Sequence, residues 1–232
     1  MFLAALIGLR VVVHLKGGNY DNFYASQPRW LRLLMRDTLR SVTQIIVLRP
    51  TLRSMFDFDP SLSNKLRFVY NRLPYRISQP GRMKSVPSPS EPWRLLFLPN
   101  LMDSKGYLDL FDATRLLVRE YHLNVRCHFW GLFFTEPTDV RVTSVKQAEK
   151  LFFDGISEFL LKQHVQYCDV VSGEREKEEL NQSHFFVLPN QYDNEAQPVS
   201  IIEAMAHGNV VIATRYRSIP DLRDESCGTF VP

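Results

Sequence analysis

The sequence predicts an α/β fold with two doubly wound parallel-sheet domains, and three observations support this. Stretches with a strand pattern alternate with stretches with a helical pattern along most of the chain, which is typical of parallel sheets with helices between the strands. Apolar runs such as Val11–Val13 are continuous and β-branched, as expected for an inner strand that is covered on both faces. A segment rich in Ser, Pro and Gly interrupts the alternation once, which predicts a linker between two domains.

The predicted linker covers residues 75–92 and separates a first domain at 1–74 from a second domain at 93–232. In the first domain the patterns predict strands at 11–15, 44–48 and 67–70, a helix at about 28–41 and a short helix near 51–56. In the second domain they predict strands near 94–98, 125–130, 165–170, 184–188 and 210–214, and helices near 105–121, 143–163, 174–181 and 198–207. The sequence shows no internal repeat of fixed period.

The composition indicates a globular protein. The chain has 232 residues, 45% of them hydrophobic, which is enough for one large core or two small ones. Cys127, Cys168 and Cys227 are odd in number and far apart, so they suggest neither a disulfide framework nor a metal cluster, and they favour a reducing cytoplasm. The apolar stretch Met1–Leu9 lacks a basic leader and is too short to span a membrane, so it is interpreted as the end of a buried helix.

The charge is distributed unevenly although the net charge is only +3. Residues 1–90 contain 14 Lys and Arg against 4 Asp and Glu. Four arginines fall on one face of the predicted helix at 28–41, whose other faces carry apolar residues. The arginines are Arg29, Arg32, Arg36 and Arg40, and the apolar residues are Trp30, Leu31, Leu34, Met35 and Leu39. Two interpretations stay open: a solvated face over the core, or attraction to an anionic membrane or a lipid-diphosphate acceptor. Nucleic acid is not predicted as a partner, because no recognised binding fold accompanies the charge.

The most informative segment is 194–208, which places two carboxylates eight positions apart. Pro198 suits the first turn of a helix and Gly208 suits the left-handed residue that ends one, so the pattern predicts a helix from about Pro198 to His207. Glu195 lies just before this helix. Glu203 lies inside it, about 7.5 Å along the axis from Pro198.

This layout fits a ligand that has hydroxyl groups at both ends and a diphosphate between them. Each carboxylate can accept hydrogen bonds from one set of hydroxyls, and the free amides at the helix start can bind the phosphates. A nucleotide-diphosphate-sugar is such a ligand. The alternative is an ordinary helix with one solvated Glu and one capping Glu.

The spacing of Glu195 and Glu203, the run Glu-Ala-Met-Ala-x-Gly at 203–208 and the strand Val210–Thr214 resemble the Glu-x7-Glu signature of family-4 retaining glycosyltransferases. The resemblance implies the GT-B fold, which consists of two Rossmann-like domains. Family members have further α/β units before the stretch that matches Phe2–Val13, and helices after the one that matches Gly228–Pro232. The resemblance therefore implies an N-terminal acceptor-side domain that is incomplete and a C-terminal donor domain without its last helices.

The resemblance also implies roles for individual residues. His14 matches a histidine that contacts the transferred sugar, and Gly17, Gly18 and Asn19 follow it on the acceptor side, where glycines permit close approach to a ligand. In the first loop of the second domain the family has an Arg and, five residues later, a Lys. Lys105 matches the Lys, next to Gly106, whereas Asn100 replaces the Arg with a neutral side chain.

At the donor motif, the resemblance implies that Glu195 contacts the sugar hydroxyls and Glu203 contacts the ribose, with donor contacts from the residues between them. These residues are Ala196, Gln197, Pro198 and Val199. The implied catalytic residues are His14 and Glu195.

The function expected from the resemblance is transfer of a sugar from a nucleotide-diphosphate-sugar to a sugar or lipid-linked acceptor with retention of configuration, in polysaccharide or glycolipid biosynthesis. The expected location is the cytoplasm, with peripheral attachment to the inner face of the membrane, and no metal or other cofactor is expected. Asp57-Phe58-Asp59 mimics the Asp-x-Asp metal site of the GT-A fold, but it precedes Pro60 and a turn is favoured. The alternative function is a truncated, non-catalytic protein that binds nucleotide-sugars or docks on membranes, which Asn100 favours.

Overall fold

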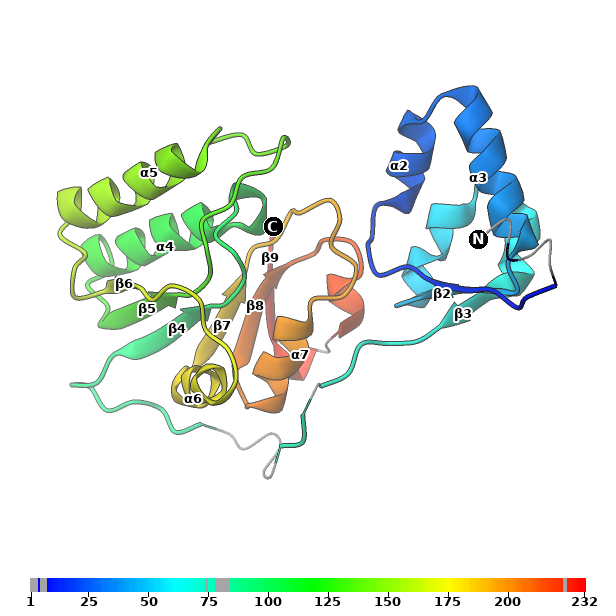
Figure 1. Cartoon of the computed structure of the whole chain (residues 1–232). Coiled ribbons are helices and arrows are strands. Elements are labelled where there is room, and N and C mark those ends of the chain that lie inside the picture. The colour runs from blue at the N-terminus through cyan, green and yellow to red at the C-terminus, as the bar shows by residue number, and fades with distance from the viewer. Residues whose placement is uncertain (1–3, 5–7, 74, 78–83, 223–224) are drawn as a thin grey trace. The chain divides into compact units, whose positions relative to one another are not determined.

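The computed structural model of the chain describes residues 4, 8–73, 75–77, 84–222 and 225–232 (Figure 1). These residues form two compact units. Unit 1 comprises residues 1–72, 193–198 and 217–221, and unit 2 comprises residues 73–192, 199–216 and 222–232. The predicted buried helix at Met1–Leu9 and the middle of the predicted linker fall largely outside the described residues.

Unit 2 is built on a six-stranded parallel sheet with the order β6-β5-β4-β7-β8-β9. The strands are β4 (Trp93–Phe97), β5 (Val125–Phe129), β6 (Val165–Tyr167), β7 (Phe185–Leu188), β8 (Val210–Thr214) and β9 (Gly228–Val231). Counted along the chain this is the order 3-2-1-4-5-6 of a doubly wound nucleotide-binding fold. The strand order reverses between β4 and β7, and such a reversal opens a crevice at the carboxyl ends of the strands.

Helices cover both faces of this sheet, as Figure 1 shows for α4 and α5 on one face and α6 and α7 on the other. They are α4 (Tyr107–Arg119), α5 (Val145–Glu158), α6 (Glu174–Gln182) and α7 (Val199–Ala206); a short 3₁₀ turn, η3 (Asp103–Lys105), precedes α4. Phe152 of α5 is fully buried and its ring packs against Phe111, Phe129 and Phe133. Burying one such aromatic side chain contributes about 2–3 kcal/mol, so this cluster fixes α4 and α5 on the sheet.

Unit 1 has a three-stranded parallel sheet, β1-β2-β3, formed by β1 (Val12–His14), β2 (Gln44–Val47) and β3 (Leu66–Phe68). Its helices are α2 (Tyr20–Ser26) and α3 (Arg29–Ser41), followed by the 3₁₀ helices η1 (Pro50–Phe56) and η2 (Pro60–Lys65). The core contains apolar residues of α3, β2, η1 and η2, and Ala196 also belongs to it. The segment 193–198 is therefore built into unit 1 although it follows β7 in the chain.

The structure confirms the predicted α/β fold with parallel sheets, and it differs from the sequence prediction in a few elements. The patterns gave no helix at α2 and no strand at β9. Val11–Val13 predicts an inner strand, but β1 is an edge strand among the described residues and Val12 is 53% exposed. A β-branched run favours extended backbone at an edge as well as inside a sheet, so the run alone could not separate the two positions.

Candidate functional site

In unit 2 the loops after β4 and β7 meet at the point where the strand order reverses. The amide of Gln191 donates a hydrogen bond to the carbonyl of Ser104 over 2.7 Å. Gly106 has a φ of 79°, and a Cβ on it would lie 2.3 Å from the carbonyl oxygen of Pro189. Only glycine fits at this position, so Gly106 lets α4 begin directly against the loop after β7.

Two polar side chains of the loop after β4 have different surroundings. Lys105 is half-buried, and its ammonium lies 5.3 Å from the centroid of the Tyr192 ring. The Oδ1 atom of Asn100 accepts a hydrogen bond from the amide of Leu132 over 3.3 Å, which ties the loop after β4 to the loop after β5. The residue that departs from the family pattern therefore has a structural role here, and the positive charge of this loop comes from Lys105.

The helix α7 and its end agree closely with the prediction. The structure begins α7 at Val199, directly after Pro198, and Gly208 has the expected left-handed φ of 75°. Glu203 is only 7% exposed. Burial, reinforced by the nearby carboxylate of Glu176, raises the pKa of Glu203 to about 7. Glu203, which is predicted to bind ribose, thus has a carboxylate whose ionised form needs hydrogen-bond donors.

One turn beyond Glu203, His207 is held from two sides. Its Nδ1 lies 2.8 Å from Oδ1 of Asn181, and its Nε2 lies 3.1 Å from the hydroxyl of Tyr75. The amide oxygen of Asn181 can only accept, so Nδ1 carries the proton and Nε2 accepts from Tyr75. Burial lowers the pKa of His207, with a further contribution from Lys84 and Lys177. A neutral imidazole with this tautomer fits both contacts.

In unit 1 the loop that follows β1 contacts the segment that carries Glu195. The amide of Gly18 donates to the carbonyl of Asn194 over 3.1 Å. A Cβ on Gly18 would lie 2.1 Å from the carbonyl oxygen of Glu195, and one on Gly17 would lie 2.3 Å from Oδ1 of Asn194. Gly18 is therefore needed for close approach to the backbone of the Glu195 segment, and Gly17 faces only the side chain of Asn194, whereas the sequence predicts that both glycines approach a ligand.

The residues after Glu195 are anchored in unit 1. Ala196 is 2% exposed and belongs to the core. Gln197 is 4% exposed; its Oε1 accepts from the amide of Asn71 over 2.7 Å, and its carbonyl accepts from Nδ2 of Asn71 over 3.0 Å. Pro198 is also buried. The side chains of Ala196 and Gln197 are thus engaged within unit 1, and only their backbone is available to a nucleotide-sugar.

His14 and Asn19 lie at the two ends of the loop after β1. His14 is the last residue of β1, pairs with Ile46 in the sheet and has an exposed side chain. Asn19 precedes α2 but makes no side-chain capping bond, and its Oδ1 is buried with no hydrogen-bond partner among the described residues. His14 therefore has room for a ligand, and Asn19 retains an unused acceptor.

Sequence reasoning missed Arg217, which contacts the loop of Gly18 and the loop that carries Asp193 and Glu195. Its Nη1 donates to the carbonyl of Gly18 over 2.7 Å, and its Nη2 lies 3.5 Å from Oδ1 of Asp193. No periodicity or motif in the sequence marks this residue, because it lies 199 positions from Gly18.

Asp59 is a capping residue whose two carboxylate oxygens are both already engaged by protein groups. It is 4% exposed, its Oδ1 accepts from the amide and hydroxyl of Ser61, and its Oδ2 accepts from Nε of Arg40 over 2.7 Å. Burial opposes its ionisation, but the hydrogen bonds from Arg40 and Ser61 outweigh this and lower the pKa of Asp59. Among the described residues, no group of three or more His, Cys, Asp or Glu is arranged to hold a metal ion.

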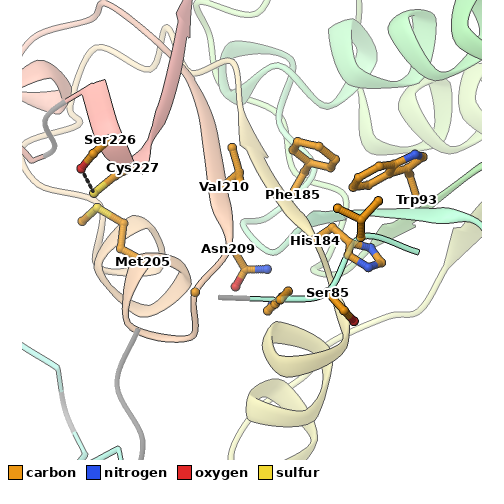
Figure 2. A pocket seen from close by; sticks show the side chains of 12 residues that line it. Ser85, Trp93, His184, Phe185, Met205, Asn209, Val210, Ser226 and Cys227 are labelled. Atoms are coloured by element: carbon orange, nitrogen blue, oxygen red, sulfur yellow. Dashed lines mark hydrogen bonds between the residues drawn. The ribbon is translucent and has the colours of Figure 1, made fainter. Parts of the chain in front are cut away.

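A separate cavity of about 450 Å³ lies at the amino ends of β4, β7 and β8, the opposite edge of the sheet from the predicted donor loops. Figure 2 shows Trp93, His184 and Phe185 on one side of it and Met205 and Cys227 on the other. Its walls are mostly apolar. Lys84, another lining residue, donates hydrogen bonds to the carbonyls of Leu180 and Ser183 at the end of α6, so its ammonium caps that helix.

The structure thus gathers the predicted residues in two groups. Unit 1 brings Gly18 against the backbone of Glu195 and Gly17 against the side chain of Asn194, and it carries His14 at the end of the same loop. Unit 2 brings the loop of Asn100, Lys105 and Gly106 against the loop after β7. Glu203 and Val199 belong to unit 2 through α7.

Several solved structures share the fold of this chain. HepE of Anabaena in complex with UDP-glucose superposes with a TM-score of 0.71 and 14% identity, over 99% of this chain and 60% of that one. A variant of S. aureus TarM in complex with fondaparinux, α-GlcNAc-glycerol and UDP gives a TM-score of 0.65 and 16% identity, over 96% of this chain and 41% of that one. The pneumococcal O-GlcNAc transferase GtfA, in complex with UDP and GlcNAc, gives a TM-score of 0.65 and 13% identity, over 99% of this chain and 42% of that one.

These identities show the fold alone, and the chain spans only 41–60% of the length of these proteins. No curated protein is significantly similar to the chain in sequence. The family profile described as "Glycosyl transferases group 1" matches residues 79–232, which include the loop after β4, Glu195 and α7. The match covers well over half of the chain, and the chain therefore belongs to the group 1 glycosyl transferases.

Proposed function

We propose that the chain transfers a sugar from a nucleotide-diphosphate-sugar to a saccharide or lipid-linked acceptor, with retention of configuration, in polysaccharide or glycolipid biosynthesis. The observation that carries the proposal is the family match over residues 79–232, which contains the segment 194–208. The UDP and UDP-glucose bound by HepE support a nucleotide donor. The reversal of strand order between β4 and β7 supports a nucleotide site in unit 2.

In this proposal the leaving diphosphate gains negative charge as the glycosidic bond breaks. Lys105 and the free amides at the start of α7, beginning with Val199, stabilise that charge. Glu195 binds hydroxyls of the transferred sugar, and His14 orients the same sugar. Ala196, Gln197 and Pro198 contribute through the backbone alone, since their side chains are buried in unit 1.

Glu203 binds the ribose in this proposal, and its burial links ribose binding to ionisation of its carboxyl. A ribose presents two hydroxyl donors, and a carboxylate accepts them best when it is ionised. Without such donors, burial and Glu176 raise the pKa of this carboxyl to about 7, so it is largely neutral below that pH. Nucleotide binding is therefore expected to release a proton from Glu203 when it occurs below about pH 7.

The decisive experiment is a thermal-unfolding screen of the chain with UDP, GDP and a panel of their sugars. Binding of one nucleotide at 100 times its Kd stabilises the folded chain by about 2.7 kcal/mol, which is a readily measured rise in Tm. If no nucleotide or nucleotide-sugar raises the Tm at millimolar concentration, the proposal fails. A positive result also identifies the base and narrows the sugar.

We also propose that transfer needs no metal ion. The diphosphate charge would be met by Lys105 and by helix amides. Sugar transfer, followed as UDP release, is expected to be unchanged in an excess of EDTA, which removes divalent ions. Loss of transfer in EDTA with recovery on added Mg²⁺ or Mn²⁺ would refute this part of the proposal.

A second candidate function is a non-catalytic protein that binds nucleotide-sugars. Asn100 favours it, because a neutral amide engaged with Leu132 stands where the family pattern has a cation. The two functions differ in turnover. UDP-sugar binding without release of UDP in the presence of saccharide or lipid-linked acceptors would favour this candidate.

The arginine face of α3 supports a proposal that the chain attaches to an anionic membrane surface. Trp30, Leu33 and Leu34 share one helix face by their spacing and are 67%, 52% and 49% exposed. Of the two interpretations left open, the solvated arginine face over the core would have buried Trp30 and Leu34. Arg29 is exposed beside them, whereas Arg40 is already paired with Asp59. An exposed apolar stripe next to cations fits the interface of an anionic bilayer.

No helix in the described part of the chain combines the length and the apolar character needed to cross a bilayer. Vesicle flotation tests the attachment. The chain is expected to bind phosphatidylglycerol vesicles more tightly than phosphatidylcholine vesicles, and Trp30→Ala with Leu34→Ala is expected to weaken binding about tenfold, since two large apolar side chains are removed. Equal binding by this double variant would refute the proposed surface.

A further inference from the structure

We infer that Arg217 is a positioning residue: its guanidinium ties the loop of Gly18 to the loop of Glu195 and so holds these two loops in register. The inference deepens the proposed function and rests on it, because His14 and Glu195 are the residues whose placement it would set. Every contact that supports it lies within unit 1.

The first support is that both backbone groups of Gly18 are hydrogen-bonded, the amide to the loop of Glu195 and the carbonyl to Arg217. The Gly18 amide donates to the carbonyl of Asn194, and the Gly18 carbonyl accepts from Nη1 of Arg217 over 2.7 Å. Nη2 of the same guanidinium lies 3.5 Å from Oδ1 of Asp193. The contacts form a closed ring from Gly18 through Asn194 and Asp193 to Arg217 and back to Gly18.

The second support is the geometry of the guanidinium. Its planar fork offers donors in fixed directions, so one side chain can bind two acceptors at a defined spacing. The Arg217 side chain is 21% exposed, against 48% for Asp193, so the ion pair is partly shielded from water. A lysine ammonium on a flexible stem would bind the same two oxygens less rigidly.

The third support is the backbone of Arg217, which has a φ of 46° in the left-handed region. A side chain with a Cβ is strained there, and glycine would not be. The presence of Arg at this point of the turn after β8 means that the contacts of its side chain compensate for the strain. The left-handed backbone also makes glycine the suitable replacement, because Arg217→Gly removes the guanidinium without adding backbone strain.

Loss of the Arg217 contacts is expected to lower the rate of sugar transfer more than the affinity for the nucleotide. Asn194 and Glu195 are adjacent in sequence, and Gly18 lies four residues after His14. Loosening the ring would displace the two proposed sugar-binding residues, and a displacement of about 1 Å can lower a rate about hundredfold. Glu203 and Lys105 belong to unit 2, and the affinity for the nucleotide is therefore expected to be preserved.

The first measurement is amide hydrogen exchange on the unliganded chain, which does not depend on activity. In Arg217→Gly the amide of Gly18 is expected to exchange at least about tenfold faster, since its bond to Asn194 opens more often. Arg217→Lys is expected to fall between this variant and the wild type. Unchanged exchange at Gly18 in Arg217→Gly would overturn the inference.

The matched control is Arg215→Gly, two positions earlier in the same turn. It removes the same charge and introduces the same residue, but Arg215 is exposed and its guanidinium lies over the ring of Phe230, 4.6 Å from the centroid. Exchange at Gly18 and the rate of transfer are expected to match the wild type in this variant. An equal acceleration of Gly18 exchange in both variants would also overturn the inference, because loss of charge would then be sufficient.

The second measurement is sugar transfer, followed as UDP release from UDP-glucose or UDP-N-acetylglucosamine. Arg217→Gly is expected to lower kcat about tenfold to hundredfold with KM for the donor within about threefold of the wild type. A wild-type kcat in this variant would overturn the positioning role and leave the proposed function standing. A wild-type chain that neither binds nor turns over any nucleotide-sugar would instead refute the proposed function, and the exchange measurement would still decide whether Arg217 holds the loops.

Discussion

The loop that carries Glu195 and the helix that carries Glu203 lie on either side of Pro198, and they are held in different ways. The Glu195 segment belongs to unit 1, where bonds to distant loops fix its backbone: Gly18 binds Asn194, and Asn71 binds Gln197. Glu203 belongs to unit 2, where a regular helix packed on a parallel sheet fixes it. One motif therefore depends on long-range contacts in its first half and on local structure in its second half.

The difference extends to the electrostatics of the two halves. On α7 the carboxyl of Glu203 is buried beside Glu176, and its pKa is raised to about 7. In unit 1 the basic side chain of Arg217 stands next to Asp193, two residues before Glu195. Changes to unit 1 should therefore act through loop geometry, and changes around α7 should act through protonation.

The largest effect is expected for Gly18→Ala. The new Cβ would lie 2.1 Å from the carbonyl oxygen of Glu195, a distance that only a shift of one backbone or the other can relieve. Such a shift is expected to lower kcat for sugar transfer about hundredfold or more. Steady-state kinetics with a UDP-sugar donor measure it.

Gly17→Ala is the matched control for this substitution. Its Cβ would meet Oδ1 of the Asn194 side chain, which can rotate away, so kcat is expected to stay within about fivefold of the wild type. If Gly18→Ala has the wild-type kcat, the Glu195 segment does not depend on the loop after β1, and the contrast between the two halves of the motif disappears.

The contrast also explains how much of the molecule the sequence could predict. The strands and helices of unit 2 other than β9 follow from periodicity, and the ends of α7 follow from Pro198 and Gly208, because these signals are local. Gly17 and Gly18 mark a close approach, but the sequence could not show that Glu195 lies on the other side of it. Pairings such as Arg217 with Gly18 or Arg40 with Asp59 leave no periodic signal, since they join residues far apart in the chain.

The second largest effect is expected at Glu203. In Glu203→Ala the affinity for UDP is expected to fall about tenfold, because charge-assisted hydrogen bonds to the ribose are lost. In the wild type the affinity is expected to rise with pH up to about 7 and then level off, as the carboxylate becomes ionised. Glu203→Gln should show no such rise, and calorimetry across pH 5.5–8.5, a range of about three units around that pKa, measures both.

Stability should change with pH in the opposite sense. Since the folded pKa of Glu203 lies above its ordinary value of 4.5, the stability that its neutral form contributes is complete below about pH 4.5 and is lost as the pH rises through 7. Without ligand, Glu203→Gln is therefore expected to have a Tm about 5 °C above the wild type at pH 8 and an equal Tm near pH 4. An equal Tm at both pH values would contradict the buried, protonated state of Glu203.

The smallest effect is expected for Tyr75→Phe, which removes a single hydrogen bond near α7. The hydroxyl of Tyr75 donates to Nε2 of His207 over 3.1 Å, and burial together with Glu203 and Glu176 raises the pKa of Tyr75 to about 12, so it remains a donor at neutral pH.

Its loss should cost about 1 kcal/mol, or about 3 °C in Tm, while UDP affinity stays within about twofold of the wild type. Phe keeps the ring that lies 4.7 Å from the Lys177 ammonium, so Tyr75→Ala should lower the Tm further. A tenfold loss of UDP affinity in Tyr75→Phe would place this hydroxyl among the nucleotide contacts. The second half of the motif would then depend on a long-range contact, as Glu195 depends on Gly18, and the contrast between the two halves would be lost.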